Sequence, residues 1–206
     1  MRVGGIVLCG GKSLRMGRPK AWLPVGDEVM LQRVVRTLRG VVGPVVVVAA
    51  PGQDVPPLPD DVPIARDPVE DRGPLQGLAA GLAALDGSAD AAFLAACDLP
   101  LLKPAFVRRL IDLLGGADAC VPAVAGYAQP LAGVYRVGVL GAVRRLLAED
   151  RRAVHGLLSA VPTRLVRAAD LIAADPNLDS LRNVNTPAAY AAILSVLARP
   201  ESGMGI

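Results

Sequence analysis

Short apolar runs typical of β-strands alternate along this chain with longer stretches in which apolar residues recur at the spacing of one helix face. The runs that predict strands are 5–9, 45–50, 62–66, 92–97, 119–124, 131–135 and 163–166. The stretches with helical spacing are 30–38, 75–85, 106–114, 139–147, 154–158 and 188–197. Strands that alternate with helices pair mostly in parallel, and the helices then cover both faces of the sheet. The sequence therefore predicts an α/β fold of three layers, α/β/α and Rossmann-like, with a mostly parallel sheet.

The length and composition suit one hydrophobic core. The chain has 206 residues, 52% of them apolar, and neither an internal repeat nor a long linker divides it. We expect residues 1–199 to form a single domain and residues 200–206 to be a frayed tail.

The charge and residue content exclude several classes of protein. A net charge of +3 with only 3% aromatic residues argues against a partner that is a nucleic acid. No apolar run approaches the roughly 18 residues that cross a bilayer, so we expect no membrane association. Three cysteines and one histidine provide neither a disulfide framework nor a zinc site, and they indicate a reducing cytoplasm.

A glycine-rich, basic segment follows the first predicted strand. Residues 8–20 contain three glycines and four cations, so backbone N–H groups and positive side chains can surround a phosphate. An ordinary glycine turn followed by a solvated basic segment is the alternative. The first glycine of a Walker A loop would fall on Ile6, and the dinucleotide fingerprint does not fit the spacing either. The segment therefore predicts a triphosphate site of another kind.

Two carboxylates come directly after predicted strands. Asp98 follows the run 92–97, and Asp67 follows the run 62–66. Ligands of such sheets bind at the carboxyl ends of the strands, where a carboxylate can bind Mg²⁺ or a base. The structural alternatives are an N-cap for Asp98 and a plain acidic loop for Asp67.

Two asparagines precede the last predicted helix. Asn183 and Asn185 alternate in the sequence, so in extended backbone their side chains point to the same side. Thr186 and Pro187 form a helix start signal, which makes an asparagine-rich turn the structural alternative. Both interpretations are compatible, because the cap can fix the loop while the amides face a ligand.

Four motifs together resemble one family of nucleotidyltransferases. They are Leu8, Gly10, Gly11, Arg15, Met16, Gly17 and Lys20; the segment 73–77, Gly-Pro-Leu-Gln-Gly; the segment 97–100, Cys-Asp-Leu-Pro; and the segment 183–187, Asn-Val-Asn-Thr-Pro. In this order they are similar to the motifs of the molybdenum cofactor guanylyltransferase family, and the resemblance spans residues 3–190. It implies a Mg²⁺-dependent enzyme that transfers GMP from GTP to the phosphate of molybdopterin and releases pyrophosphate.

The resemblance also implies roles for individual residues. The implied catalytic residues are Arg15, Lys20 and Asp98. The implied nucleotide-binding residues are Leu8, Cys9, Gly10, Gly11, Lys20, Asp67, Gly73 and Asp98, with Asp67 reading the guanine base. Asp98 and Asn185 would hold Mg²⁺, and Asn183 and Asn185 would form a loop toward the acceptor or the metal.

Other functions stay open at this point. Arg18, Pro19 and Lys20 look like the sister cytidylyltransferases, and residues 49–52 lack the asparagine that family members often carry there. A CTP-dependent enzyme, a transferase for another small phosphorylated acceptor, and a nucleotide-binding regulatory module without turnover are the alternatives. As partners we expect GTP, molybdopterin, and proteins that insert the cofactor or receive it as molybdoenzymes. We expect a monomer.

Overall fold

The computed structural model describes residues 1–10, 19–67 and 72–198, and a central sheet organises them. Its strands are β1 (Val3–Leu8), β4 (Val45–Ala49), β5 (Ile64–Arg66), β6 (Ala91–Ala96), β7 (Ala119–Val124), β8 (Tyr127–Ala128), β9 (Ala132–Arg136) and β10 (Thr163–Arg167). The order across the sheet is β10-β7-β9-β6-β1-β4-β5, and β8 pairs with β7 beside this path. All seven strands predicted from the sequence are present.

The sheet is mostly parallel, as predicted, with one full-length exception. β6, β1, β4 and β5 are parallel neighbours, and β10 is parallel to β7. β9 runs antiparallel to both β6 and β7. The reversal begins at a tight turn between β7 and β8, where Ala125 and Gly126 both have positive φ angles of 51° and 83°. Such angles at two successive residues are typical of hairpin turns.

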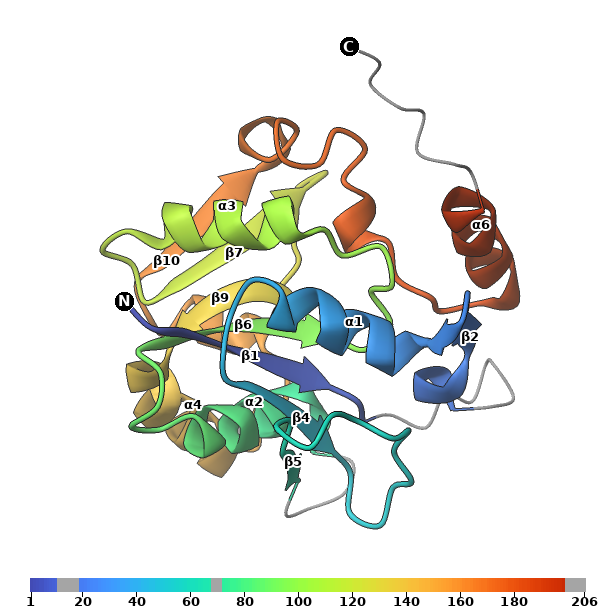
Figure 1. The fold of residues 1–206 in the computed structure, drawn as a ribbon. Coiled ribbons are helices and arrows are strands. Elements are labelled where there is room, and N and C mark those ends of the chain that lie inside the picture. The colour runs from blue at the N-terminus through green and yellow to red at the C-terminus, as the bar shows by residue number, and fades with distance from the viewer. Residues whose placement is uncertain (11–18, 68–71, 199–206) are drawn as a thin grey trace.

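The described helices coincide with the six stretches of helical spacing. They are α1 (Met30–Arg39), α2 (Gly73–Ala84), α3 (Pro104–Leu114), α4 (Leu140–Ala148), α5 (His155–Leu158) and α6 (Pro187–Leu197). Figure 1 shows α1 and α3 on one face of the sheet and α2 and α4 on the other. The three-layer α/β/α prediction is therefore confirmed.

Side chains of β1 alternate between the two layers of helices. Ile6 and Leu8 belong to the core that α2, α4 and α5 complete. Val7 and Cys9 belong to the core that α1 and α3 complete. This period of two is the reason that an uninterrupted apolar run forms a strand buried on both faces.

Helix α2 approaches β1 unusually closely because it carries glycines on the facing side. A Cβ atom added to Gly81 would lie 2.6 Å from Cγ2 of Ile6, and one added to Gly77 would lie 3.0 Å from Cδ2 of Leu8. This contact holds the first turn of α2 beside the carboxyl end of β1.

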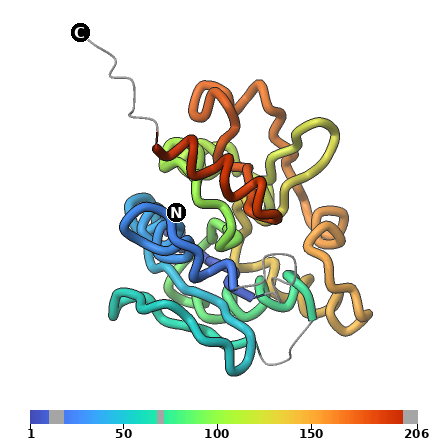
Figure 2. Tube along the Cα trace, turned by 90° about the vertical axis from the view of Figure 1, so that its right-hand side faces the viewer, coloured from blue at the N-terminus to red at the C-terminus, as the bar shows by residue number. Residues whose placement is uncertain are grey.

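A small third core connects the last helix to the segment after the glycine-rich loop. This segment contains the 3₁₀ turn η1 (Lys20–Trp22) and a two-stranded sheet of β2 (Pro24–Val25) and β3 (Glu28–Val29), which sequence analysis missed because each strand has two residues. Ile193 of α6 packs there with Val25 and Val184. Figure 2 shows α6, in red, on the outside of the molecule. None of the described helices is long and apolar enough to span a membrane.

Candidate active site

A deep cleft opens at the carboxyl ends of β1, β4, β5 and β6. Its volume is about 1240 Å³. Its lining residues come from the strand ends, the start of α2 and three later segments, and they are Leu8–Gly10, Pro19, Lys20, Val48–Gln53, Asp67, Arg72–Pro74, Gly77, Ala96–Leu99, Ala128–Ala132, Ala153–His155, Leu181, Asn183 and Asn185. Sites for one small ligand usually enclose about 300 to 1000 Å³. This cleft therefore has room for two substrates side by side.

The polar centre of the cleft joins three residues that are far apart in the sequence. The Nζ atom of Lys20 donates to Oδ2 of Asp98 at 2.8 Å and to Oδ1 of Asn185 at 2.6 Å. The Lys20 and Asp98 side chains are only 18% and 14% exposed. Partial burial strengthens their attraction beyond that of a surface ion pair. Two of the predicted catalytic residues and one predicted metal ligand thus lie in direct contact.

Asp98 extends from the end of β6 and does not cap the next helix. Lys103 occupies the N-cap position of α3, and Pro104 begins the helix. The N-cap alternative for Asp98 is therefore wrong. Its carboxylate is available to the cleft and to Lys20.

The asparagine loop is attached to Asp98 through its backbone. Val184 is fully buried, and its N–H donates to the carbonyl oxygen of Asp98 at 3.0 Å. Asn183 and Asn185 on either side of it both line the cleft, as their alternation predicts. Thr186 caps α6, since its Oγ1 accepts from the N–H of Ala189 at 3.1 Å. The helix-cap interpretation of this segment is therefore confirmed, whereas the interpretation that its amides face a ligand stays a prediction.

Asp67, predicted to read the base, and Gly73, predicted to bind the nucleotide, both line the cleft. Asp67 follows β5, and its N–H donates to the carbonyl oxygen of Ala49 at 2.9 Å. Gly73 has a positive φ of 76°, and a Cβ atom there would lie 2.9 Å from the carbonyl oxygen of Arg152. Any larger residue at position 73 would therefore push the segment around Arg152 away from α2.

Gln53 is a residue of the cleft that sequence analysis missed. Its Nε2 donates to the carbonyl oxygen of Cys9 at 2.9 Å, and its Oε1 accepts from the N–H of Ala50 at 3.0 Å. Arg66 donates to the carbonyl oxygens of Gln53 and Ala50 at 2.7 and 3.1 Å. These bonds fix the loop after β4 against the end of β1. An amide just beyond the end of a predicted strand was the available signal.

Cys9 and Cys97 sit next to each other on the cleft floor, at the ends of β1 and β6. Both are buried, and both are free thiols. The hydrogen bond between the two side chains lowers the pKa of Cys9, and the same bond together with burial raises the pKa of Cys97. Cys97 therefore keeps its proton at neutral pH.

Two further basic residues without a family motif line the cleft, and the part of the lining that Arg72 and His155 form is called the far wall. Arg72 precedes α2 and forms an exposed ion pair with Asp150, with 3.4 Å between NH1 and Oδ1. His155 begins α5, and its Nε2 lies 3.3 Å from the carbonyl oxygen of Ala128. The two remaining predicted site residues, Gly11 and Arg15, lie outside the described residues.

The donor set at the centre of the cleft fits a hard divalent cation such as Mg²⁺. Oδ2 of Asp98 and Oδ1 of Asn185 converge on one positive charge, the ammonium of Lys20. Among the described residues there is no group of three or more histidine, cysteine or acidic side chains that could hold a metal on its own. Mg²⁺ usually takes one or two protein oxygens and completes its shell with phosphate oxygens and water. The site therefore suits an ion that arrives with a triphosphate.

Comparison with known proteins places the chain among nucleotidyltransferases. Residues 5–168 match the MobA-like NTP transferase domain. A Mycobacterium avium protein, named as a probable molybdenum cofactor guanylyltransferase, is 36% identical over 202 residues, which cover 96% of this chain and 98% of that protein. A Carboxydothermus hydrogenoformans protein of the same name is 30% identical over 95% of this chain and 96% of its own length.

Solved structures share the fold over nearly the whole chain. Molybdopterin-guanine dinucleotide biosynthesis protein A from Archaeoglobus fulgidus gives a TM-score of 0.77 at 21% identity and covers 95% of this chain and 98% of its own. A Mycobacterium tuberculosis protein in complex with manganese gives 0.66 at 20% identity, with 95% and 99% covered. The 2-C-methyl-D-erythritol 4-phosphate cytidylyltransferase of Thermus thermophilus gives 0.69 at 16% identity, with 93% and 97% covered. The fold alone therefore does not distinguish GTP from CTP.

Proposed function

This chain belongs to the MobA-like NTP transferase family, and we propose that it transfers GMP from GTP to the phosphate of molybdopterin and releases pyrophosphate. The observation that carries the proposal is the contact of Lys20 with Asp98 and Asn185 inside a cleft large enough for two substrates. The relatives named as guanylyltransferases support the choice of substrates.

In this reaction a phosphate oxygen of the acceptor forms a bond to the α-phosphorus of GTP. The bond from that phosphorus to the bridging oxygen of pyrophosphate breaks, and the pyrophosphate oxygen takes the electron pair. Two anions must approach each other, so the protein has to neutralise charge at the point of attack. The ammonium of Lys20 sits on a flexible stem at this point and can contact the α-phosphate oxygens.

Asp98 and Asn185 are the residues that would hold Mg²⁺. When bound there, the ion supplies charge neutralisation at the α-phosphate and the leaving pyrophosphate. The backbone of Leu8–Gly10 forms the floor of the nucleotide side of the cleft. The hydrogen bonds of Gln53 to Cys9 and Ala50 fix this floor before the nucleotide arrives.

Nucleotide choice is the first test of this function. A carboxylate at Asp67 can accept from the N1–H and the 2-amino group of guanine, which cytosine cannot offer together. An unmet buried polar group costs about 1 to 3 kcal/mol, or about tenfold to over a hundredfold in preference. We expect the wild type to prefer GTP by such a ratio of kcat/KM values, and Asp67→Ala to erode it.

The control variant is Asp60→Ala, because Asp60 is exposed and does not line the cleft. A wild-type preference for CTP would show that the guanylyl assignment is wrong. A GTP preference that survives Asp67→Ala would place base recognition on other groups, such as the backbone of Leu8–Gly10. GTP binding without pyrophosphate release in the presence of acceptor would favour the regulatory module.

We propose that the far wall of the cleft receives the phosphate of the acceptor. Lys20, Arg72 and His155 are the basic side chains among the described lining residues. Since Lys20 is assigned to the α-phosphate in this proposal, Arg72 and His155 are left for the acceptor. The ion pair of Arg72 with Asp150 is exposed on both sides, so it is weak and easily exchanged for a phosphate. A hydrogen bond to a charged group contributes about 1.5 to 3 kcal/mol.

We therefore expect Arg72→Gln to raise the KM for the acceptor about tenfold or more, with a smaller change in the KM for GTP. His155→Gln should act in the same direction. Arg144→Gln is the matched control, because Arg144 is exposed on α4 and does not line the cleft. Equal effects of Arg72→Gln on both KM values would assign Arg72 to the triphosphate instead.

A further inference from the structure

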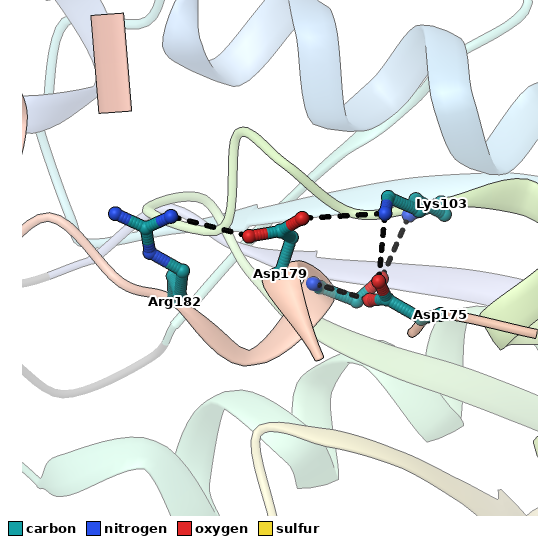
Figure 3. A network of polar contacts seen from close by, with 5 residues as sticks. Lys103, Asp175, Asp179 and Arg182 are labelled. Atoms are coloured by element: carbon teal, nitrogen blue, oxygen red, sulfur yellow. Dashed lines mark hydrogen bonds and ion pairs between the residues drawn. The ribbon is translucent and has the colours of Figure 1, made fainter. Parts of the chain in front are cut away.

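A network of charged side chains connects Lys103 with residues 175–182, the segment that precedes the asparagine loop (Figure 3). Nζ of Lys103 lies 2.7 Å from Oδ1 of Asp175 and 3.3 Å from Oδ2 of Asp179. NH1 of Arg182 lies 3.1 Å from Oδ1 of Asp179. Oδ2 of Asp175 accepts from the N–H of Ser180 at 2.7 Å, and Oγ of Ser180 accepts from the N–H of Lys103 at 3.0 Å.

The two carboxylates of this network are withdrawn from solvent. The Asp175 side chain is 0% exposed and that of Asp179 is 10% exposed. A buried charge is tolerated only where it is paired and hydrogen-bonded, so each of these carboxylates requires its partners. Removing Lys103 would take away the cation that pairs with Asp175, while the hydrogen bond from the N–H of Ser180 to Asp175 remains.

The charge states of the network agree with its geometry. Burial lowers the pKa of Lys103, but hydrogen bonds to Asp175 and Asp179 outweigh it and hold this pKa above its usual value. Burial raises the pKa of Asp179, but Arg182 and Lys103 outweigh it and hold this pKa below its usual value. Lys103 is therefore protonated and Asp179 ionised at neutral pH.

The network connects two segments that also meet at the candidate metal site. The first segment runs from Asp98 to Lys103, and the second runs from Asp175 to Asn185. At one end, the ion pairs of Lys103 with Asp175 and Asp179 join the two segments. At the other end, the N–H of Val184 donates a hydrogen bond to the carbonyl oxygen of Asp98. Two attachment points fix the second segment along its length, so the position of Asn185 relative to Asp98 depends on both.

We propose that Lys103 is a positioning residue, which holds the asparagine loop against Asp98 through Asp175 and Asp179 so that Asn185 and Asp98 converge. Lys103 does not line the cleft, so it acts through these partners and not on a substrate. The inference rests on the proposed function where it treats Asn185 and Asp98 as metal ligands. That Lys103 fixes the asparagine loop against Asp98 does not depend on that function. Residues that orient metal ligands typically change metal affinity by about 10- to 100-fold.

Two readouts test this role without relying on turnover. The first is Mn²⁺ affinity, measured by electron paramagnetic resonance in the presence of GTP and without acceptor. The second is hydrogen exchange at the amide of Val184. We expect Lys103→Met to weaken Mn²⁺ binding about tenfold and to speed exchange at Val184. Lys103→Arg keeps the positive charge, so its Mn²⁺ affinity and its exchange rate at Val184 should both lie close to the wild-type values.

The matched control is Arg39→Met. Arg39 pairs with Asp61 at 2.7 Å on α1, and neither residue lines the cleft. This variant should leave both readouts at wild-type values. If Lys103→Met does not fold, Arg182→Met replaces it, because Arg182 is 40% exposed and holds the same Asp179.

Wild-type exchange at Val184 in a folded Lys103→Met or Arg182→Met protein would overturn the proposal. Faster exchange at Val184 with an unchanged Mn²⁺ affinity would overturn the proposal as well. The network would then stabilise the loop without positioning the metal ligands. Failure of the proposed function is distinguishable, since it would show as absent GTP turnover in a wild type whose Val184 exchange still responds to these substitutions.

Discussion

Replacing Asp98 with asparagine should lower kcat for nucleotidyl transfer by about 10²- to 10³-fold, because one positioned electrostatic group at a reacting centre has effects of this size. The substitution keeps the shape of the side chain and removes its charge. Asp98 caps no helix, so the start of α3 should be unaffected. The variant should therefore fold normally and lose most of its turnover.

The charge of Asp98 has two partners in the proposed reaction. It pairs with Lys20 at 2.8 Å, and it would supply the anionic ligand of Mg²⁺, for which the amide oxygen of asparagine is a weaker donor. We expect the apparent Mg²⁺ requirement to rise as kcat falls. The measurement is the initial rate of pyrophosphate release across a Mg²⁺ titration.

Asp61→Asn is the matched control, because Asp61 is also paired with a cation, Arg39, but lies outside the cleft. It should retain the wild-type rate. Turnover of Asp98→Asn close to wild type at saturating Mg²⁺ would remove Asp98 from both roles.

The layers of the fold could be predicted because each strand and helix is a local pattern. In β1 the alternation of Ile6 and Leu8 against Val7 and Cys9 already requires apolar cover on both faces. The direction of β9 could not be predicted in the same way. It depends on the turn at Ala125 and Gly126, where two positive φ angles reverse the chain, and alanine gives no signal for such a conformation.

The candidate site likewise has residues that a local sequence pattern predicts and residues that only the folded chain brings together. Asp67 and Asp98 were accessible to sequence analysis because each follows a strand, and strand ends converge at one edge of a parallel sheet. The contact of Lys20 with Asn185 joins residues 165 positions apart, and no local pattern encodes it. Arg72 and His155 carry no motif, and the segments that hold them meet where Gly73 packs closely against the carbonyl oxygen of Arg152.

The Lys103 network shows a third limit on prediction from sequence, which concerns the burial of charged residues. In the sequence Asp175 and Asp179 look like ordinary polar loop residues, which are usually solvated. Tertiary packing buries both and makes their pairing obligatory. Burial is a property of the whole fold, so a charged residue that positions a loop cannot be distinguished from a surface charge by its local pattern.

Lys20→Ala should depress kcat more strongly than it weakens GTP binding. The ammonium lies between Asp98 and Asn185. From there it can contact the α-phosphate of the proposed reaction, where negative charge redistributes as the new bond forms. An interaction that is stronger in the transition state than in the ground state acts on kcat. We expect a loss of about 10²- to 10³-fold in kcat, with GTP affinity changed by less than about tenfold.

Lys20→Arg separates charge from shape. A guanidinium keeps the positive charge but spreads it over a planar fork, which cannot occupy the compact position between the Asp98 and Asn185 oxygens in the same way. Its kcat should lie between those of Lys20→Ala and the wild type. Equilibrium GTP binding and single-turnover rates, measured on all three proteins, distinguish the possibilities. If Lys20→Ala raises only the KM for GTP and leaves the single-turnover rate intact, Lys20 anchors the triphosphate and transition-state stabilisation must come from other groups.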